Sequence, residues 1–233
     1  THFEDCCGLT DSTEHYTSAR DIAIMTRELT TRFPKIFEYS KIWMENITHV
    51  TRNGSSEFGL TNTNKLLRSF EGCTGLKTGS TSMAKFCLSA TATRNNIDLI
   101  SVIMAGPDSK TRFRDAAALL TYGFGICSVY CDEEPPELPD AMIQNGIKDT
   151  VPCHYGNTFS YLSTKNENFS EIEKQMMWVE ELEAPVEAGQ QIGTLSYILN
   201  GKEIGNVPIL ASEDVKRANY IDYLKKAAES WLL

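Results

Sequence analysis

The sequence predicts an α+β fold in which helices pack on an antiparallel sheet, followed by a small, mostly β domain. Three strand-like runs, 76–80, 86–93 and 99–105, follow one another with only short turns between them, as expected for neighbouring antiparallel strands. Runs with helical period stand before and after these strands. Farther along, an acidic, proline-rich stretch interrupts the pattern, and strand and turn signals dominate the chain that follows it.

A helix is predicted over residues 16–33, ahead of the sheet. Ser18 and Asp21 have the spacing of a capping box, in which a side-chain oxygen accepts a hydrogen bond from the first turn of the helix. The apolar side chains that follow recur on one face. Pro34 cannot continue a helix and should end it.

Two less regular segments connect this helix to the sheet. Residues 42–50 mix β-branched and aromatic side chains and precede Asn53-Gly54, which predicts a strand followed by a turn. A short helical stretch is expected over residues 64–70. The runs 76–80 and 86–93 then form a predicted hairpin, and 99–105 is apolar enough to be a strand buried on both faces.

The last helix of the first domain is predicted to begin after Asp108, whose carboxylate can cap it. Its apolar side chains keep helical spacing as far as Gly125, which offers a stop. We expect this helix to lie against the sheet, because its apolar stripe has to be covered.

Composition changes after Tyr130, where the run Asp-Glu-Glu-Pro-Pro at 132–136 suits no packed element. We therefore expect a first domain over 1–130, a β-rich domain over 131–214 and an amphipathic C-terminal helix over 215–233. The β-rich domain contains the strongest short-range hairpin signal of the chain, which is Asn200-Gly201 between two strand-like runs.

The overall composition excludes some classes of partner. A formal net charge of −9 and a pI near 5.0 do not supply the basic surface that a nucleic acid requires. Seven cysteines at irregular spacings, and four histidines without partners at catalytic spacing, give no metal motif. We expect no nucleic-acid partner, no metal and no other cofactor.

The informative run for function is Gly75-Leu76-Lys77-Thr78-Gly79-Ser80, which places Lys-Thr-Gly on a predicted edge strand. Lys-Thr-Gly alone is a common chance sequence. Here it is accompanied by further characteristic runs, at 1–3, 8–21, 62–67, 88–92, 108–113, 184–186 and 201–205. In combination, the sequence resembles the low-molecular-weight penicillin-binding proteins, which are serine-type D-alanyl-D-alanine carboxypeptidases.

The resemblance implies part of a domain like that of the DD-peptidases and β-lactamases, followed by the family's C-terminal β domain. It implies an enzyme that trims the terminal D-alanine of peptidoglycan stem peptides through an acyl-enzyme and that β-lactams inhibit. The expected location is extracytoplasmic, either secreted or on the outer face of the cytoplasmic membrane. The amphipathic tail could attach to a membrane surface or pack on its own protein.

The resemblance also implies roles for five residues. Lys77 is the strand lysine that orients the catalytic hydroxyls and attracts an anionic substrate, and Thr78 offers a hydroxyl to the substrate carboxylate. Gly79 leaves room for the substrate backbone, and the N–H of Ser80 is one donor of the oxyanion hole. Arg112 helps to hold the carboxylate, a task that suits its planar donor fork; the alternative is a surface arginine in the first turn of a helix.

The family's nucleophile motifs, Ser-x-x-Lys and Ser-x-Asn, precede the region that matches Thr1, so we expect them in an N-terminal segment of the same protein. Ser82-Met83-Ala84-Lys85 fits Ser-x-x-Lys literally, but it falls in a predicted turn, whereas the motif works at the start of a helix. Lys85 also stands where the family commonly has glycine. A competing interpretation is a non-catalytic cell-wall binding or spacer module.

Overall fold

The computed structural model describes residues 1–9, 12–52 and 54–231. The chain divides into two compact units, Thr1–Ser128 and Val129–Leu233. Asn53 of the predicted Asn-Gly turn, and residues 232–233 at the end of the predicted C-terminal helix, lie outside the described residues.

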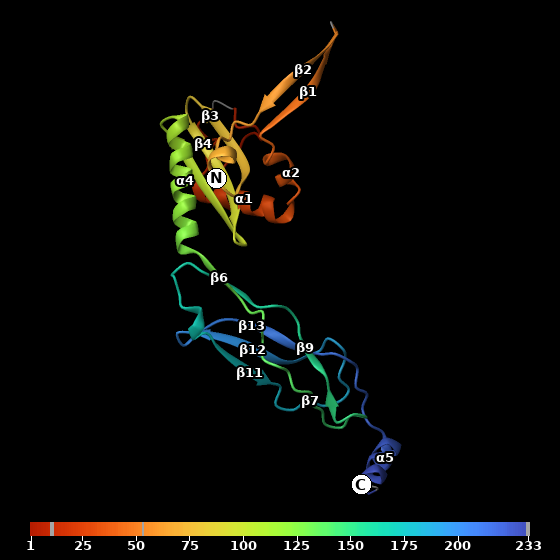
Figure 1. Ribbon diagram of the computed structural model, residues 1–233. Coiled ribbons are helices and arrows are strands. Elements are labelled where there is room, and N and C mark those ends of the chain that lie inside the picture. The colour runs from red at the N-terminus through yellow and green to blue at the C-terminus, as the bar shows by residue number, and fades with distance from the viewer. Residues whose placement is uncertain (10–11, 53, 232–233) are drawn as a thin grey trace. The chain divides into compact units, whose positions relative to one another are not determined.

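The first unit is built around a three-stranded antiparallel sheet with the order β3-β4-β5, which confirms the predicted fold class. The strands are β3 (Cys73–Thr81), β4 (Lys85–Arg94) and β5 (Ile97–Gly106). Within the described part of the chain, β3 pairs only with β4 and therefore forms one edge of the sheet (Figure 1). This edge strand carries the Lys-Thr-Gly run.

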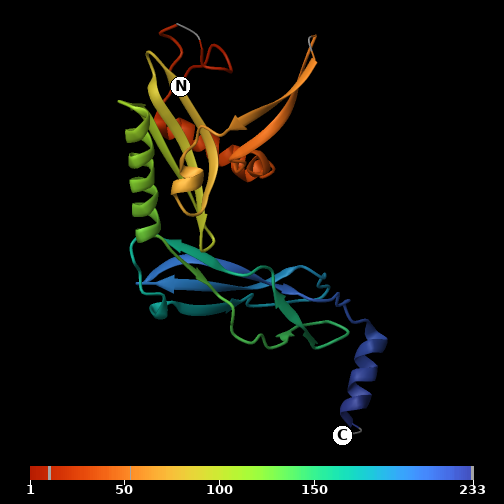
Figure 2. The same ribbon diagram turned by 45° about the horizontal axis from the view of Figure 1, so that its top comes forward.

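Helix α4 (Ser109–Ile126) covers one face of the sheet (Figures 1 and 2). The Asp108 carboxylate accepts from the N–H of Thr111 at 2.7 Å and caps the helix as predicted. Apolar side chains of β4, of α4 and of the short helix α3 (Leu66–Ser69) form one core beneath it. The buried members of this core are Leu66, Phe70, Leu88, Ala90, Ala92, Phe113, Ala116 and Leu120.

Helix α1 (Ala19–Arg32) lies against the opposite face. The Thr26 hydroxyl on α1 lies 2.7 Å from that of Ser89, and Ser89 alternates along β4 with residues that face α4. The Ser18 side chain accepts from the N–H of Asp21, so the predicted cap is confirmed. The predicted start at Tyr16 is wrong by three residues, because the backbone of Tyr16 pairs with His2.

A two-stranded hairpin of β1 (Met44–Thr51) and β2 (Gly54–Thr61) extends from this unit (Figure 2). All residues of both strands are exposed. The sequence predicted the first strand but neither the second strand nor the short helix α2 (Ile36–Ser40). The start of β2 is rich in Gly and Ser, residues that are typical of turns, and its pairing with β1 was therefore not visible in its composition.

The second unit is mostly β, as predicted. Its main sheet has the order β11-β12-β13-β9 and two small strand pairs accompany it. Asn200 and Gly201 both have positive φ, at 52° and 71°, as the tight turn of the predicted hairpin requires. The elements are β6 (Ser128–Cys131), β7 (Ala141–Met142), β8 (Thr150–Val151), β9 (Cys153–Tyr155), β10 (Ser160–Ser163), η1 (Phe169–Glu171), β11 (Glu173–Trp178), β12 (Gln191–Leu199) and β13 (Lys202–Ala211).

A buried polar network lies inside this unit. Asp132 is 6% exposed; one of its carboxylate oxygens accepts from the Lys174 ammonium at 2.8 Å and the other from the Tyr197 hydroxyl at 2.7 Å. The Tyr197 ring stacks on Phe159 with ring centroids 3.7 Å apart. The first acidic residue of the proline-rich stretch therefore anchors that stretch to the β core.

The C-terminal helix α5 runs over Tyr220–Trp231. The predicted start at 215 is wrong, because Val215 forms a bridge with Val186 and Arg217 forms one with Gly146. The Lys226 ammonium donates to the carbonyl of Gly146 at 2.9 Å, which fixes the helix to the β core. Among the described helices, none is both long and apolar enough to cross a membrane.

Candidate active site

The side chains of Lys77 and Thr78 on the edge strand β3 project to opposite faces of the sheet. Lys77 lies opposite Ser89, and Thr78 lies opposite Leu88. Directly opposite residues of an antiparallel pair project to the same face. Lys77 therefore projects from the face that carries α1, and Thr78 projects from the face that carries α4.

Lys77 is exposed, and its ammonium donates a hydrogen bond to the backbone carbonyl of Thr78. Within the described residues, no carboxylate forms an ion pair with this ammonium. An uncompensated cation at a sheet edge attracts anionic ligands. Attraction of an anionic substrate stays the predicted role of Lys77.

Thr78 is 9% exposed, and its hydroxyl oxygen lies 2.6 Å from that of Thr63. Thr63 was not among the predicted site residues. It stands between two asparagines just before α3, and Asn64 donates to the carbonyl of Gly75 on β3 at 2.9 Å. The segment that contains Thr63 is thereby held against the signature strand.

Gly79 provides open space at the edge strand. A Cβ built on Gly79 would have no heavy atom within 4 Å, so the absence of a side chain here serves no internal packing need. An extended peptide that pairs with a sheet edge needs such a clear backbone. The geometry at Gly79 is compatible with the substrate-backbone position that we expect for it.

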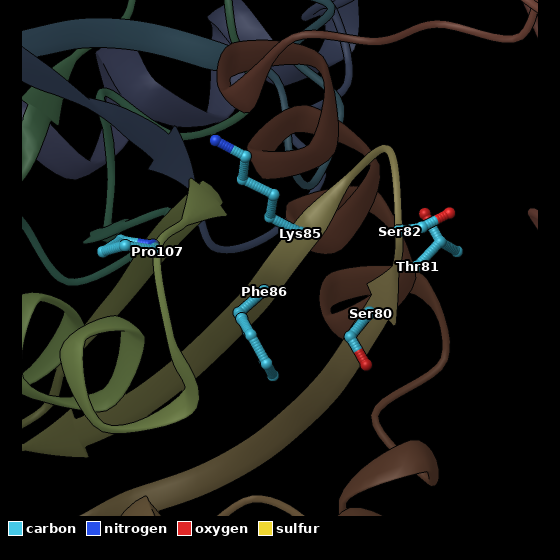
Figure 3. Close-up of a pocket in the computed structure, with 6 residues that line it drawn as sticks. All are labelled: Ser80, Thr81, Ser82, Lys85, Phe86 and Pro107. Carbon is cyan, nitrogen blue, oxygen red and sulfur yellow. The ribbon is translucent and has the colours of Figure 1, made fainter.

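Ser80 lines a hollow of about 610 Å³ at the turn between β3 and β4, together with Thr81, Ser82, Lys85, Phe86 and Pro107. Figure 3 shows Ser80 and Phe86 pointing to the same side of the hairpin, whereas Ser82 and Lys85 point away from each other. No hydrogen bond of the described residues joins Ser82 to Lys85. The literal Ser-x-x-Lys run therefore has no nucleophile–base geometry.

Lys85 has a left-handed backbone, with φ of 54°. A glycine reaches this conformation without steric cost, whereas a lysine with its Cβ does so at some strain. The turn therefore has a backbone conformation that suits the glycine expected here from the resemblance better than it suits lysine.

Arg112 reaches β3 from the first turn of α4. It is 6% exposed, and its Nη1 donates at 3.1 Å to the carbonyls of both Gly79 and Cys87. Its guanidinium lies over the rings of Phe86 and Phe113, at 5.4 and 4.8 Å from their centroids, and burial lowers the pKa of Arg112. The alternative of a surface arginine is therefore wrong.

The guanidinium has donors to spare. In the described part of the chain, neither Nε nor Nη2 of Arg112 makes a hydrogen bond, and Nε is buried. A buried donor without an acceptor costs free energy. Three of the five predicted site residues, Thr78, Gly79 and Arg112, thus meet around one segment of the edge strand.

Two models of known protein families match parts of this chain. Residues 1–108 match the family model described as D-alanyl-D-alanine carboxypeptidase, and residues 137–217 match that of the penicillin-binding protein 5 C-terminal domain. The two matches together cover most of the chain, which is therefore similar over most of its length to the penicillin-binding D-alanyl-D-alanine carboxypeptidases.

Individual relatives give the same result. The D-alanyl-D-alanine carboxypeptidases DacF of Bacillus subtilis and DacA of Escherichia coli are each 28% identical to this chain and match 99% of it. Penicillin-binding protein 5 from Haemophilus influenzae is similar in structure, with 28% identity and a TM-score of 0.64 over 89% of this chain and 59% of that one. The chain spans 58% of DacF and 57% of DacA.

Proposed function

We propose that this chain is the C-terminal part of a serine-type D-alanyl-D-alanine carboxypeptidase. The protein would remove the terminal D-alanine of peptidoglycan stem peptides outside the cytoplasm. The observation that carries the proposal is the open edge strand β3, on which Lys77, Thr78 and Gly79 are joined by Arg112 from α4. In this proposal, residues 1–130 belong to the catalytic domain and 131–214 form the β domain.

The proposed chemistry is acyl transfer. The substrate backbone adds to β3 alongside Gly79, and the N–H of Ser80 donates to the oxyanion of the tetrahedral intermediate. Lys77 attracts the anionic substrate, while Thr78 and Arg112 hold its terminal carboxylate. The serine nucleophile and its lysine come from an N-terminal segment of the same protein, and β-lactams acylate that serine.

The proposed role of α5 is to contact a membrane surface. Its exposed side chains include Tyr220, Ile221 and Leu224, while Lys226 is held by the β core. Apolar side chains on one side of a short helix can lie at a lipid interface.

The isolated chain should form no covalent adduct with a fluorescent penicillin, because its literal Ser-x-x-Lys run lacks the geometry of an activated nucleophile. Denaturing gel electrophoresis and intact-mass measurement would detect an adduct. The full-length protein, encoded with its upstream sequence, should be labelled under the same conditions.

Ser82→Ala is the control for this experiment. Labelling of the isolated chain that disappears in Ser82→Ala would contradict the proposal and make Ser82 the nucleophile. An open reading frame that begins near Thr1, without an upstream Ser-x-x-Lys, would instead favour the non-catalytic cell-wall module.

Arg112→Gln in the full-length enzyme should lower kcat/KM for a D-Ala-D-Ala peptide with a free carboxylate by roughly tenfold or more, the effect of one lost charge-assisted contact. The same variant should barely change kcat/KM for the C-terminally amidated peptide, which has no charge to hold. The ratio of the two values is the measurement.

Arg114→Gln is the matched control, because Arg114 lies on the same helix but is exposed and, among the described residues, forms an ion pair only with Asp115. Arg112 also binds two backbone carbonyls, so circular dichroism has to show that Arg112→Gln folds. A ratio unchanged within about twofold in a folded variant would leave carboxylate recognition to Lys77 and Thr78.

A further inference from the structure

The segment Asn62-Thr63-Asn64 is braced at both ends against neighbouring elements. Asn62 donates to the carbonyl of Ile42 at 3.0 Å and accepts from the N–H of Asn64 at 2.9 Å. Asn64, which is 1% exposed, donates to the carbonyl of Gly75 on β3 at 2.9 Å. Two side-chain amides thus fix the backbone on either side of Thr63.

Thr63 is itself exposed, and its hydroxyl meets the buried hydroxyl of Thr78 at 2.6 Å. Each hydroxyl has one proton to donate and two lone pairs to accept with. If Thr78 donates to Thr63, the Thr78 hydroxyl has no proton left to donate to another acceptor. If Thr63 donates to Thr78, the Thr78 proton stays free for another acceptor.

The direction of the hydrogen bond between Thr63 and Thr78 matters for binding a substrate carboxylate, because an ionised carboxylate can only accept hydrogen bonds. When a carboxylate binds beside Thr78, the Thr78 hydroxyl donates to the carboxylate and has to accept from the Thr63 hydroxyl. Hydrogen bonds in such a chain polarise one another and are stronger together than apart. Thr63 is placed to complete this chain without touching the substrate.

We infer that Thr63 is a positioning residue that directs the Thr78 hydroxyl toward the terminal carboxylate of the substrate, and so contributes to selectivity for free-acid peptides. This inference rests on the function proposed above. It assigns a specificity role to a residue outside the Lys-Thr-Gly run.

The test is Thr63→Val in the full-length enzyme, since valine keeps the shape of threonine and removes its hydroxyl. For the free-acid D-Ala-D-Ala peptide, kcat/KM should fall about three- to tenfold, the usual effect of one neutral hydrogen bond. The loss should appear mainly as a higher KM. For the amidated peptide, kcat/KM should stay within about twofold.

Two variants serve as controls. Thr63→Ser retains the hydroxyl and should restore selectivity for the free acid. Thr61→Val makes the same chemical change at an exposed threonine two residues earlier, on β2, and should leave both substrates unaffected. An equal fall in kcat/KM for both substrates in Thr63→Val would overturn the inference, because that pattern indicates a structural role.

A double-mutant cycle with Thr78→Val tests whether Thr63 acts through Thr78. Thr63→Val should have no further effect on the free-acid substrate in the Thr78→Val background, since the chain is already broken there. Additive losses would overturn the inference. If the wild-type full-length protein releases no D-alanine, the proposed function is wrong. If the wild type releases D-alanine and Thr63→Val has the same kcat/KM for the free-acid peptide, only the role of Thr63 is wrong.

Discussion

Replacing Lys77 with alanine in the full-length protein should slow acylation by a fluorescent penicillin by about a hundredfold or more. The reason is electrostatic: the lysine is a fixed charge next to the reacting groups, and one preorganised contact of this kind typically contributes that factor. The measurement is the time course of labelling at several penicillin concentrations, which separates binding from acylation.

Lys110→Ala is the matched control, because Lys110 is an exposed lysine in the first turn of α4. It should acylate at the wild-type rate. If Lys77→Ala also acylated at the wild-type rate, the Lys-Thr-Gly run would have no catalytic meaning in this protein.

Replacing Asp132 with alanine should lower the free energy of unfolding of the second unit by about 3 kcal/mol, because the substitution leaves a partly buried ammonium and a buried phenol without their shared acceptor. The side chain of Lys174 is 25% exposed and that of Asp132 only 5%. Urea unfolding of the whole chain, followed by circular dichroism, measures the change.

Glu133→Ala is the control for Asp132, since it removes the exposed acidic neighbour and should change the stability very little. An Asp132→Ala variant as stable as the wild type would mean that water takes the place of the Asp132 carboxylate without lowering the free energy of unfolding.

The Asp132 network should also depend on pH. Burial raises the pKa of Asp132, but hydrogen bonds from Lys174 and Tyr197 outweigh it and hold the pKa below its ordinary value. A carboxylate with a depressed folded pKa stabilises the protein above its unfolded pKa, and this contribution is lost as the pH falls through the folded pKa. The stability gap between wild type and Asp132→Asn should therefore narrow in acid below about pH 4.

Local signals account for the parts of the fold that the sequence predicted. Ser18 and Asp108 cap helices through contacts only three residues long, and the Asn200-Gly201 turn needs only its own two residues to adopt positive φ. Such features depend only on residues within a few positions of one another, so a single sequence is enough to recognise them.

Contacts between distant segments account for what the sequence did not predict. Val215 does not belong to the C-terminal helix, in contrast to the prediction, because its backbone pairs with Val186. Thr63 lies in the candidate site because its hydroxyl contacts that of Thr78 on β3. The burial of Arg112 likewise depends on Phe86 and on carbonyls of two strands. No local pattern around these residues shows where their partners lie.

The open edge of β3 has a consequence for the handling of the protein. A strand that is available to a peptide is equally available to the same strand of another molecule, and such edge-to-edge pairing leads to self-association. Lys77 stands in the middle of this strand, so antiparallel pairing of two copies would bring two ammonium groups together. The lysine that we propose for substrate attraction would then also keep the molecules apart, and solutions of Lys77→Ala should be the more prone to aggregate.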